Sequence, residues 1–446
     1  MEKVILPNGL RVLLDWQDHA RSASFGVWVK SGPVYENKEN NGISHFMEHM
    51  VFKGTATRTS LQISEEMDSI GGQMNAYTTS DFTCFYARAL EEHIGQAFDI
   101  VSDMVVNPRF DPKDLELEKS VVAEEISMSE DQPEDRVAEN LYRRIWRDSP
   151  LGMPILGTRQ TLERLGQKDM FAYHAQHYAP DQVVVAICGR FDRDAFLQQV
   201  DSRFGGIARS KAQPEETPVS YIQSCAFENS KQEQTHLCLG LPGISIWDDR
   251  RHALSILHMI LGGSSSSRLF QKIREELGLA YSISSGVASY QTGGLLEVQT
   301  AVSPGADRRA CEEILGVLSQ LQREGVTEKE FLRAREQLKS NLVMGTESTS
   351  ARAGRMGRSE ILRNRVESED DLLAQINAVT WELVNQTARE LLDLSRLSVS
   401  VVGPSDQEAY YQSITGRPQE GTSRAYGGYI ALQAFPEKNL TARDET

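Results

Sequence analysis

The order of expected secondary-structure elements occurs twice along the chain, and this repeat limits the possible folds more than any other feature. Alternating apolar residues predict strands, and apolar residues with a period of 3.6 predict helices. The first half is expected to contain a strand at 22–30, helices at 42–53 and 59–70, two strands within 73–90, helices at 91–106, 112–130, 133–147 and 167–178, and a strand at 181–189. The second half is expected to contain a strand at 235–241, helices at 248–261 and 265–277, strands within 281–300, and helices at 305–323 and 327–346.

Individual residues also match between the halves in the same order, which is typical of a duplicated domain. The matching residues are His49-Met50 with His258-Met259, Gly54 with Gly263, Leu115 with Phe331, Lys119 with Arg335, and Met128 with Met344. The polar stretch KAQPEETP (211–218) is the best linker candidate. We therefore predict a first domain at 1–210, a linker at 211–220 and a second, homologous domain at 221–446, whose tail begins near residue 415.

Length, charge and cysteine content narrow the class of protein. A chain of 446 residues is too long for one compact core, which also favours two domains. Five widely spaced cysteines without a CxxC pair argue against disulfides and favour a reducing cytoplasm. No apolar run is long enough to cross a membrane, and the N-terminus lacks the pattern of a signal peptide. The formal net charge of −16 argues against nucleic acid or anionic membrane as a partner.

Residues 45–49 read His-Phe-Met-Glu-His, within the helix expected at 42–53. His45 and His49 are one turn apart, so both imidazoles leave the same helix face and can bind one tetrahedral Zn²⁺. Glu48 lies on that side but is displaced, so it can reach a metal-bound water without binding the metal. This HxxEH order is the inverse of HExxH. A histidine pair on a helix also occurs at ordinary surface or core positions, so a metal site needs a third ligand.

The helix expected at 112–130 contains four candidate acids, Glu116, Glu118, Glu124 and Glu125. Glu118 and Glu125 are two helical turns apart and share a face, whereas Glu124 points about 100° away from Glu125. A solvated acidic helix is the alternative interpretation of this segment. Together with the histidines, the acids favour a His₂Glu metal site with an open fourth position.

The motif HFMEHMVFKGT, followed by Glu125, resembles the pitrilysin, insulinase and mitochondrial-processing-peptidase family of zinc peptidases. The resemblance extends over nearly the whole chain and includes DQPEDR (131–136), PLGMPILGT (150–158) and VVVAICG (183–189). It implies an α+β fold of two homologous domains, each a mainly antiparallel sheet with helices packed on one face. It also implies that Glu125 is the third zinc ligand and that Glu118 supports the site. Ser149 stands where the family usually has a histidine, and we assign it no role.

The same resemblance implies four substrate-binding residues. Asn75 and Ala76 lie on the strand that, in relatives, pairs with the extended backbone of the peptide. Arg274 and Tyr281 resemble a pair that relatives contribute from the second domain to the substrate backbone and the developing oxyanion. From the residues alone, Asn75 could equally satisfy a strand end, and Arg274 could be an ordinary surface arginine.

The second half lacks the ligand set. Leu254 and Leu257 correspond to His45 and Glu48, whereas His258 alone corresponds to a ligand, His49. The counterparts of Glu118 and Glu125 are Ala334 and Asn341. We therefore expect one Zn²⁺ per chain, with a second domain that closes the substrate chamber.

Two other sequence patterns resemble a phosphate-binding loop and a metal-binding pair, but they fit these motifs poorly. Gly262 to Ser267 is rich in glycine and serine, but it lacks the lysine of a phosphate-binding loop and is read as a flexible loop. His174 and His177 are read as part of an ordinary helix end rather than as a second metal pair.

These observations predict a cytoplasmic zinc metalloendopeptidase in which Glu48 is the general base. Its substrates would be peptides or unfolded segments that bind as an added β-strand. A homodimer is expected, and a heterodimer is an alternative. A non-catalytic core or partner subunit of a processing-peptidase-like complex is a second interpretation of the chain. A third is a zinc hydrolase that acts on a non-peptide substrate.

Overall fold

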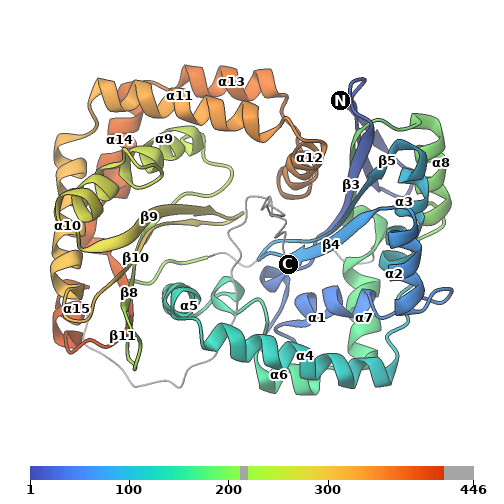
Figure 1. Cartoon of the computed structure of the whole chain (residues 1–446), viewed down its shortest axis with the longest axis horizontal. Coiled ribbons are helices and arrows are strands. Elements are labelled where there is room, and N and C mark those ends of the chain that lie inside the picture. Colours follow the sequence, from blue (N-terminus) through green and yellow to red (C-terminus); the bar gives the residue numbers. More distant parts are fainter. Residues whose placement is uncertain (211–218, 416–446) are drawn as a thin grey trace, which may run out of the picture.

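The computed structural model describes residues 1–210 and 219–415, which form two β-sheets surrounded by helices. Figure 1 shows the sheet of the first half on the right and the sheet of the second half on the left. The first sheet contains β1 (Glu2–Ile5), β2 (Arg11–Trp16), β3 (Ser22–Val29), β4 (Gln73–Thr78), β5 (Thr83–Leu90) and β6 (Val183–Gly189). The second contains β7 (Cys225–Asn229), β8 (Thr235–Pro242), β9 (Ala280–Ser289), β10 (Gly294–Val302) and β11 (Ser398–Gly403).

The two sheets have the same topology apart from one edge strand. The first follows the order β1-β2-β6-β3-β5-β4 and the second the order β7-β11-β8-β10-β9. In each sheet one pair is parallel, β2 with β6 and β7 with β11, and the other pairs are antiparallel. The predicted fold class, two related α+β halves with mainly antiparallel sheets, is confirmed.

The helices lie between these strands along the chain, in part as runs of several helices in succession. In the first half they are α1 (Ile43–Val51), α2 (Ser60–Ser69), α3 (Ile94–Val106), α4 (Pro112–Glu130), α5 (Pro133–Ile145), α6 (Arg159–Arg164), α7 (Gln167–His177) and α8 (Arg193–Phe204). In the second half they are α9 (Arg251–Leu261), the π-helical segment η5 (Phe270–Glu276), α10 (Asp307–Glu324), α11 (Glu328–Gly345), α12 (Thr349–Arg363), α13 (Glu369–Ala378), α14 (Trp381–Leu391) and α15 (Glu408–Ile414). Single 3₁₀ turns are η1 (Pro33–Tyr35), η2 (Glu91–His93), η3 (Pro150–Gly152), η4 (Pro180–Gln182) and η6 (Leu394–Arg396).

Local sequence signals explain where the helices near the site begin. The side chain of Asp111 accepts a hydrogen bond from the backbone N–H of Lys113, and Pro112 occupies the first turn of α4, where its missing N–H costs nothing. Thr59 and Gln62 form a capping box at the start of α2.

Alternation along the strands separates two apolar layers in the first half. On β3, Phe25 and Val27 face a core formed with the half's own helices, whereas Trp28 faces the opposite side of the sheet. Every residue of β6 is buried, because both faces of this central strand are covered.

Each sheet has one face packed against helices of its own half. The opposite face is covered by one helix from the other half. Residues Ala353 and Met356 of α12 pack against Trp28 and Cys84 of the first sheet. Polar contacts accompany this packing. For example, Arg352 pairs with Asp15 at 2.8 Å, and the hydroxyls of Ser350 and Ser24 are 2.8 Å apart. In Figure 1, α12 accordingly lies beside β3 and β5.

The exchange is reciprocal. Leu141 and Ile145 of α5, a helix of the first half, pack against Cys238 and Leu295 of the second sheet. The resemblance led us to expect helices on one face of each sheet, and the structure adds a helix from the other half on the second face. The reason is physical, because the outward-facing residues of β3, β6, β8 and β10 are themselves apolar and need a cover.

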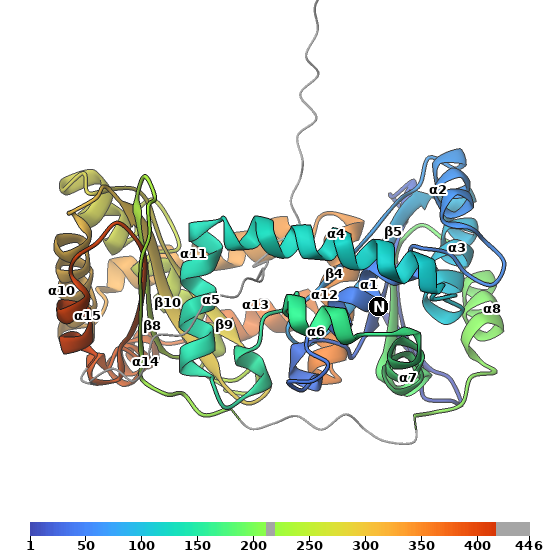
Figure 2. The same cartoon turned by 90° about the horizontal axis from the view of Figure 1, so that it is seen from below.

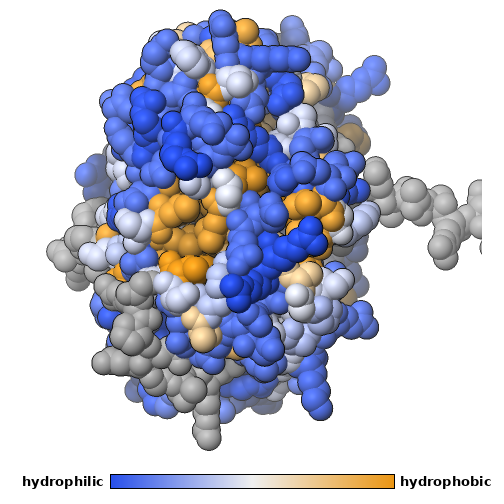
Figure 3. Space-filling view, turned by 90° about the vertical axis from the view of Figure 1, so that its left-hand side faces the viewer, coloured by the Kyte–Doolittle hydropathy of each residue, from blue (hydrophilic) through white to orange (hydrophobic). Residues whose placement is uncertain are grey.

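Among the described residues, the helix that follows the parallel strand pair is shorter in the second half than in the first. The helix α15, which follows β11, has 7 residues, whereas α8, which follows β6, has 12. Apolar side chains against the second core, such as Phe227 and Tyr410, are only partly buried. Figure 3, which views this side, shows a group of apolar residues at the surface.

No helix of residues 1–210 and 219–415 is long and apolar enough to cross a membrane. Most of the predicted linker (211–218) and of the predicted tail (416–446) lies outside the described residues. The predicted domain limits at 210 and 221 stay a prediction.

Candidate active site

The helix α1, which contains His45, Glu48 and His49, is held at its N-terminus by a buried carboxylate. Glu36 accepts hydrogen bonds from the backbone N–H groups of Gly42 and Ser44, at 2.7 and 2.9 Å, and from the side chain of Asn41 at 2.9 Å. A carboxylate at this end satisfies helix N–H groups that have no partner within the helix. Burial raises the pKa of Glu36, although these hydrogen bonds work against the rise.

Gly42 itself is needed at the start of α1. Its φ of 92° is in the left-handed region, and an added Cβ would lie 2.7 Å from Cα of Gly157. The loop 154–157 therefore packs directly against the first turn of the helix.

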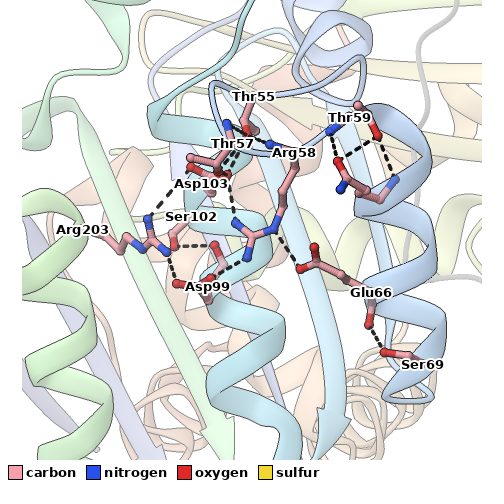
Figure 4. A network of polar contacts seen from close by, with 11 residues as sticks. Thr55, Thr57, Arg58, Thr59, Glu66, Ser69, Asp99, Ser102, Asp103 and Arg203 are labelled. Carbon is pink, nitrogen blue, oxygen red and sulfur yellow. Dashed lines mark hydrogen bonds and ion pairs between the residues drawn. The ribbon is translucent and has the colours of Figure 1, made fainter.

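The loop after α1 is anchored by a charged network, which Figure 4 shows. Arg58 pairs with Glu66 of α2 at 2.9 Å, and with Asp99 and Asp103 of α3 at 2.7 and 2.9 Å. Arg203 of α8 also pairs with Asp99. Because these partners come from three helices, both ends of α1 are fixed relative to the rest of the first half.

His45, His49 and Glu125 converge, although Glu125 comes from α4. Oε2 of Glu125 is 3.6 Å from Nε2 of His45 and 3.5 Å from Nε2 of His49. One nitrogen or oxygen from each residue lies within 4.8 Å of the others, and this is the one such group of three found in the described part of the chain. Figure 2 shows α4 passing in front of α1.

The donor set fits a tetrahedral zinc ion. Ligand bonds of about 2.1 Å place neighbouring donors around such an ion about 3.4 Å apart. The two separations from Glu125, 3.6 and 3.5 Å, are close to this value. Two imidazoles and one carboxylate leave a fourth position open, which is typical of catalytic rather than structural zinc sites.

A second acid orients His49. Oε1 of Glu118 is 2.8 Å from Nδ1 of His49, and Oε2 of Glu118 is 2.5 Å from Nζ of Lys53. The contact at Nδ1 leaves Nε2 of His49 directed at Glu125, as required of a metal-binding imidazole.

The charges around His49 favour a cation. Burial works against protonation of His49, but its contacts with Glu118 and Glu125 outweigh burial and raise its pKa to about 9. Burial lowers the pKa of His45 to about 4, and repulsion from His49 adds to this effect. The two carboxylates thus stabilise positive charge beside neutral His45, and a divalent cation would supply such charge.

Glu48 lies beside the three donors and is bonded to the neighbouring sheet. The hydroxyl of Thr78, the last residue of β4, donates a 2.6 Å hydrogen bond to Oε2 of Glu48. Burial raises the pKa of Glu48 to about 7, against the opposing effect of the Thr78 hydrogen bond. A carboxylate with such a pKa can accept and release a proton near neutral pH.

Asn75 and Ala76 lie on β4, which is an edge strand of the first sheet. Among the described residues β4 pairs with β5 alone. The side chain of Asn75 accepts a hydrogen bond from the backbone N–H of Ala76 at 2.9 Å. Within residues 1–210 and 219–415, the strand that ends at the Glu48 contact thus has one edge without a strand neighbour.

Arg274 and Tyr281 contact each other in the second half. The guanidinium of Arg274 lies 4.8 Å from the ring centre of Tyr281 and 4.7 Å from that of Phe270. Tyr281 is 80% exposed and is the second residue of β9, an edge strand of its sheet. Among the described residues, no hydrogen bond, ion pair or ring contact joins this pair to α1 or to α4.

The structure brings together four of the predicted residues, His45, Glu48, His49 and Glu125, with Glu118 next to them. Sequence reasoning missed Glu36, Lys53 and Thr78. Glu36 could have been found from the sequence. The N-cap residue of α1 is a glycine, which has no side chain to cap the helix, and an acid a few residues earlier can take that role. Nothing in the sequence indicates Thr78, because its contact depends on how β4 packs against α1.

The second half and the other histidine pair contain no comparable site in the described residues. His258 bonds Ser285 at 2.8 Å, and Leu254 and Leu257 are core residues of α9. His174 and His177 contact separate backbone carbonyls, those of Val105 and Lys30, at 2.8 and 2.9 Å.

Two related α+β halves, one of which holds converging imidazoles and a carboxylate, define a class of two-domain folds with one candidate metal centre. The family model described as insulinase (peptidase family M16) matches residues 11–159, and the model described as the M16 inactive domain matches residues 164–338. The chain belongs to the M16 family.

Similar sequences and structures agree with this assignment. The chain is 39% identical to "Uncharacterized zinc protease YmxG" of Bacillus subtilis over 399 residues, which cover 89% of this chain and 97% of the relative. It is 38% identical to "Uncharacterized zinc protease ML0855" of Mycobacterium leprae, over 90% of this chain and 91% of the relative.

Two solved structures have the same fold at 19% sequence identity. A protease from Helicobacter pylori superposes with a TM-score of 0.85 over 90% of this chain and 99% of the other. A chain of "Complex III2 from Candida albicans, Inz-5 bound" superposes with a TM-score of 0.80 over 93% of this chain and 98% of the other.

Proposed function

We propose that the protein is a zinc metalloendopeptidase, with one Zn²⁺ per chain bound by His45, His49 and Glu125. The observation that supports this most strongly is the convergence of these three donors next to Glu48. Relatives named zinc proteases, similar over nine-tenths of the chain, support the choice of metal and of reaction.

The protein residues around the donors have distinct tasks in this proposal. When bound, the ion supplies Lewis acidity, which polarises a carbonyl and acidifies water. Glu48 accepts the proton of the attacking water at a carboxylate oxygen and later delivers it to the leaving amine. The Thr78 hydrogen bond holds one oxygen of Glu48 and leaves the other for this proton. Glu118 keeps His49 in the tautomer and orientation that binding requires.

The substrate is a peptide or an unfolded segment that adds to β4 as a further strand. The side of β4 that has no strand neighbour among the described residues offers backbone N–H and C=O groups for this pairing. Asn75 contacts the peptide backbone there. Arg274 and Tyr281 approach the same peptide from the second half and stabilise the oxyanion, with a homodimer as the working assembly.

The alternative is a non-catalytic core or partner subunit. The likeness to a chain of a Complex III2 structure supports the shared fold, and at 19% identity it carries no more than that. The complete donor set of this chain favours the enzyme, because a purely structural subunit would not need it.

A peptide-library digest of the wild type and of Glu48→Gln tests the proposal. Gln has the shape of Glu but cannot accept the proton, so we expect the variant to retain zinc and to lose at least about a hundredfold in hydrolysis. Peptide cleavage at the wild-type rate by Glu48→Gln, or no cleavage of any peptide by the wild type, would refute the proposed function.

A further inference from the structure

Three large apolar side chains are exposed on α4, the helix that contains Glu125. Leu117 is 64% exposed, Val121 is 47% exposed and Met128 is 63% exposed. We refer to Leu117, Val121 and Met128 as the α4 ridge. Exposed apolar residues are ordinary when scattered singly, but several of them on one helix face often mark a binding surface. Glu124, which is also exposed, lies at the edge of this face.

The α4 ridge lies directly beside the metal ligand. Val121 precedes Glu125 by one turn and Met128 follows it by three residues, so both are surface neighbours of Glu125 on the helix. At 100° per residue they lie about 40° and 60° around the helix axis from Glu125. The buried residues Val122 and Ile126 lie on the opposite side of Glu125. Glu125 therefore separates the core face of α4 from the α4 ridge.

We infer that the α4 ridge binds a large apolar side chain of the peptide next to the bond that is cleaved, with Val121 and Met128 as the determining residues. This inference rests on the proposed function. The α4 ridge adjoins the metal centre, which is why we assign it a side chain of the peptide. A peptide carbonyl held at the three donors would place the side chains next to it close to Val121 and Met128.

The second half provides a matched control. Met344 of α11 is the repeat counterpart of Met128 and is 59% exposed. Asn341 and Ala334 stand on α11 in place of Glu125 and Glu118. Met344→Ser therefore removes the same exposed methionine from a helix without metal donors.

The experiment is a peptide-library digest by the wild type, by the double variant Val121→Ser/Met128→Ser and by Met344→Ser, with the cleaved bonds identified by mass spectrometry. We expect the wild type and Met344→Ser to favour Leu, Met or Phe over Ser at one position beside the cleaved bond by about tenfold. The double variant should lose most of this preference, and Val121→Leu/Met128→Leu should retain it. Circular dichroism checks that each variant is folded.

Three outcomes would overturn the inference. If the double variant cleaves with the wild-type preference, the α4 ridge does not select substrates, although the proposed function stands. If the preference is unchanged but sedimentation velocity shows that the double variant loses a dimer, the α4 ridge binds a second copy of the chain. If the wild type cleaves no peptide at all, the proposed function fails and the inference fails with it.

Discussion

Thr78 and Glu48 join the two elements on which the proposed reaction depends. The hydroxyl of Thr78, at the end of β4, donates a 2.6 Å hydrogen bond to Oε2 of Glu48 on α1. The proposed general base is thus fixed to the strand along which the peptide is proposed to bind. A shift of the strand would move the base.

Replacement of Thr78 by Val should lower kcat about tenfold, because a hydrogen bond to a carboxylate is worth about 1.5–3 kcal/mol and part of that loss appears in the transition state. Thr78→Ser retains the hydroxyl and should retain most of the activity. Steady-state kinetics on a fluorogenic peptide measures both. Equal losses in the two variants would contradict this role of the hydroxyl, because Thr78→Ser retains it.

Replacement of Glu118 by Gln should weaken zinc binding about 10-fold to 100-fold, as is typical when the partner of a metal-binding histidine is removed. Competition with a chelator measures the affinity. Glu116→Gln is the control, because Glu116 lies on the same helix with its side chain 73% exposed. A Glu118→Gln affinity equal to that of the control would exclude the orienting role.

His177 should make the fold sensitive to acid. Burial lowers its pKa to about 4 from the ordinary 6.5, although a contact with the carbonyl of Lys30 opposes this. Below pH 6.5 the unfolded chain takes up a proton that the folded chain does not, so stability is lost as the pH falls from 6.5 to 4. The full effect is ~3 kcal/mol. Urea unfolding of the wild type and of His177→Gln at several pH values should give a shallower decline for the variant, and parallel declines would contradict this account.

Gly357 should tolerate no side chain. Its added Cβ would lie 2.3 Å from the ring of Trp28, where α12 crosses the first sheet. We expect Gly357→Ala to destabilise the protein by about 1–3 kcal/mol. Gly316 is a helical glycine on α10 with nothing within 4 Å of an added Cβ, and Gly316→Ala should stabilise by up to about 1 kcal/mol. Thermal unfolding of the two variants measures the difference. Similar melting temperatures for Gly357→Ala and Gly316→Ala would show that the contact between Gly357 and Trp28 is loose.

Much of the fold could be predicted because its signals are local. The predicted helix at 112–130 matches α4, since Asp111 and Pro112 mark its start. The helices and strands after residue 346 were not predicted, and they include α12. Its place on the other half's sheet depends on contacts with Trp28 and Cys84, which are more than 250 residues away in the sequence.

The residues of the candidate site could likewise be predicted where their signal is local and not where it depends on tertiary contacts. His45 and His49 could be paired from helix geometry, and Glu118 with Glu125 from their shared face. The choice of Glu125 as the ligand came from resemblance to a family, because spacing left Glu118 equally possible. The structure distinguishes their positions, since Glu118 contacts Nδ1 of His49 whereas Glu125 lies between the two imidazoles. Thr78 could not be found from the sequence, because its contact is tertiary.

The measurement that tests the central claim most directly is the zinc content of the purified chain, compared with that of His49→Ala and His258→Ala. These histidines occupy matching positions of the repeat, but His49 alone has Glu118 and Glu125 around it. We predict one zinc per chain in the wild type and in His258→Ala, and less than about a tenth of that in His49→Ala. A His49→Ala protein that keeps a full zinc equivalent would contradict the account.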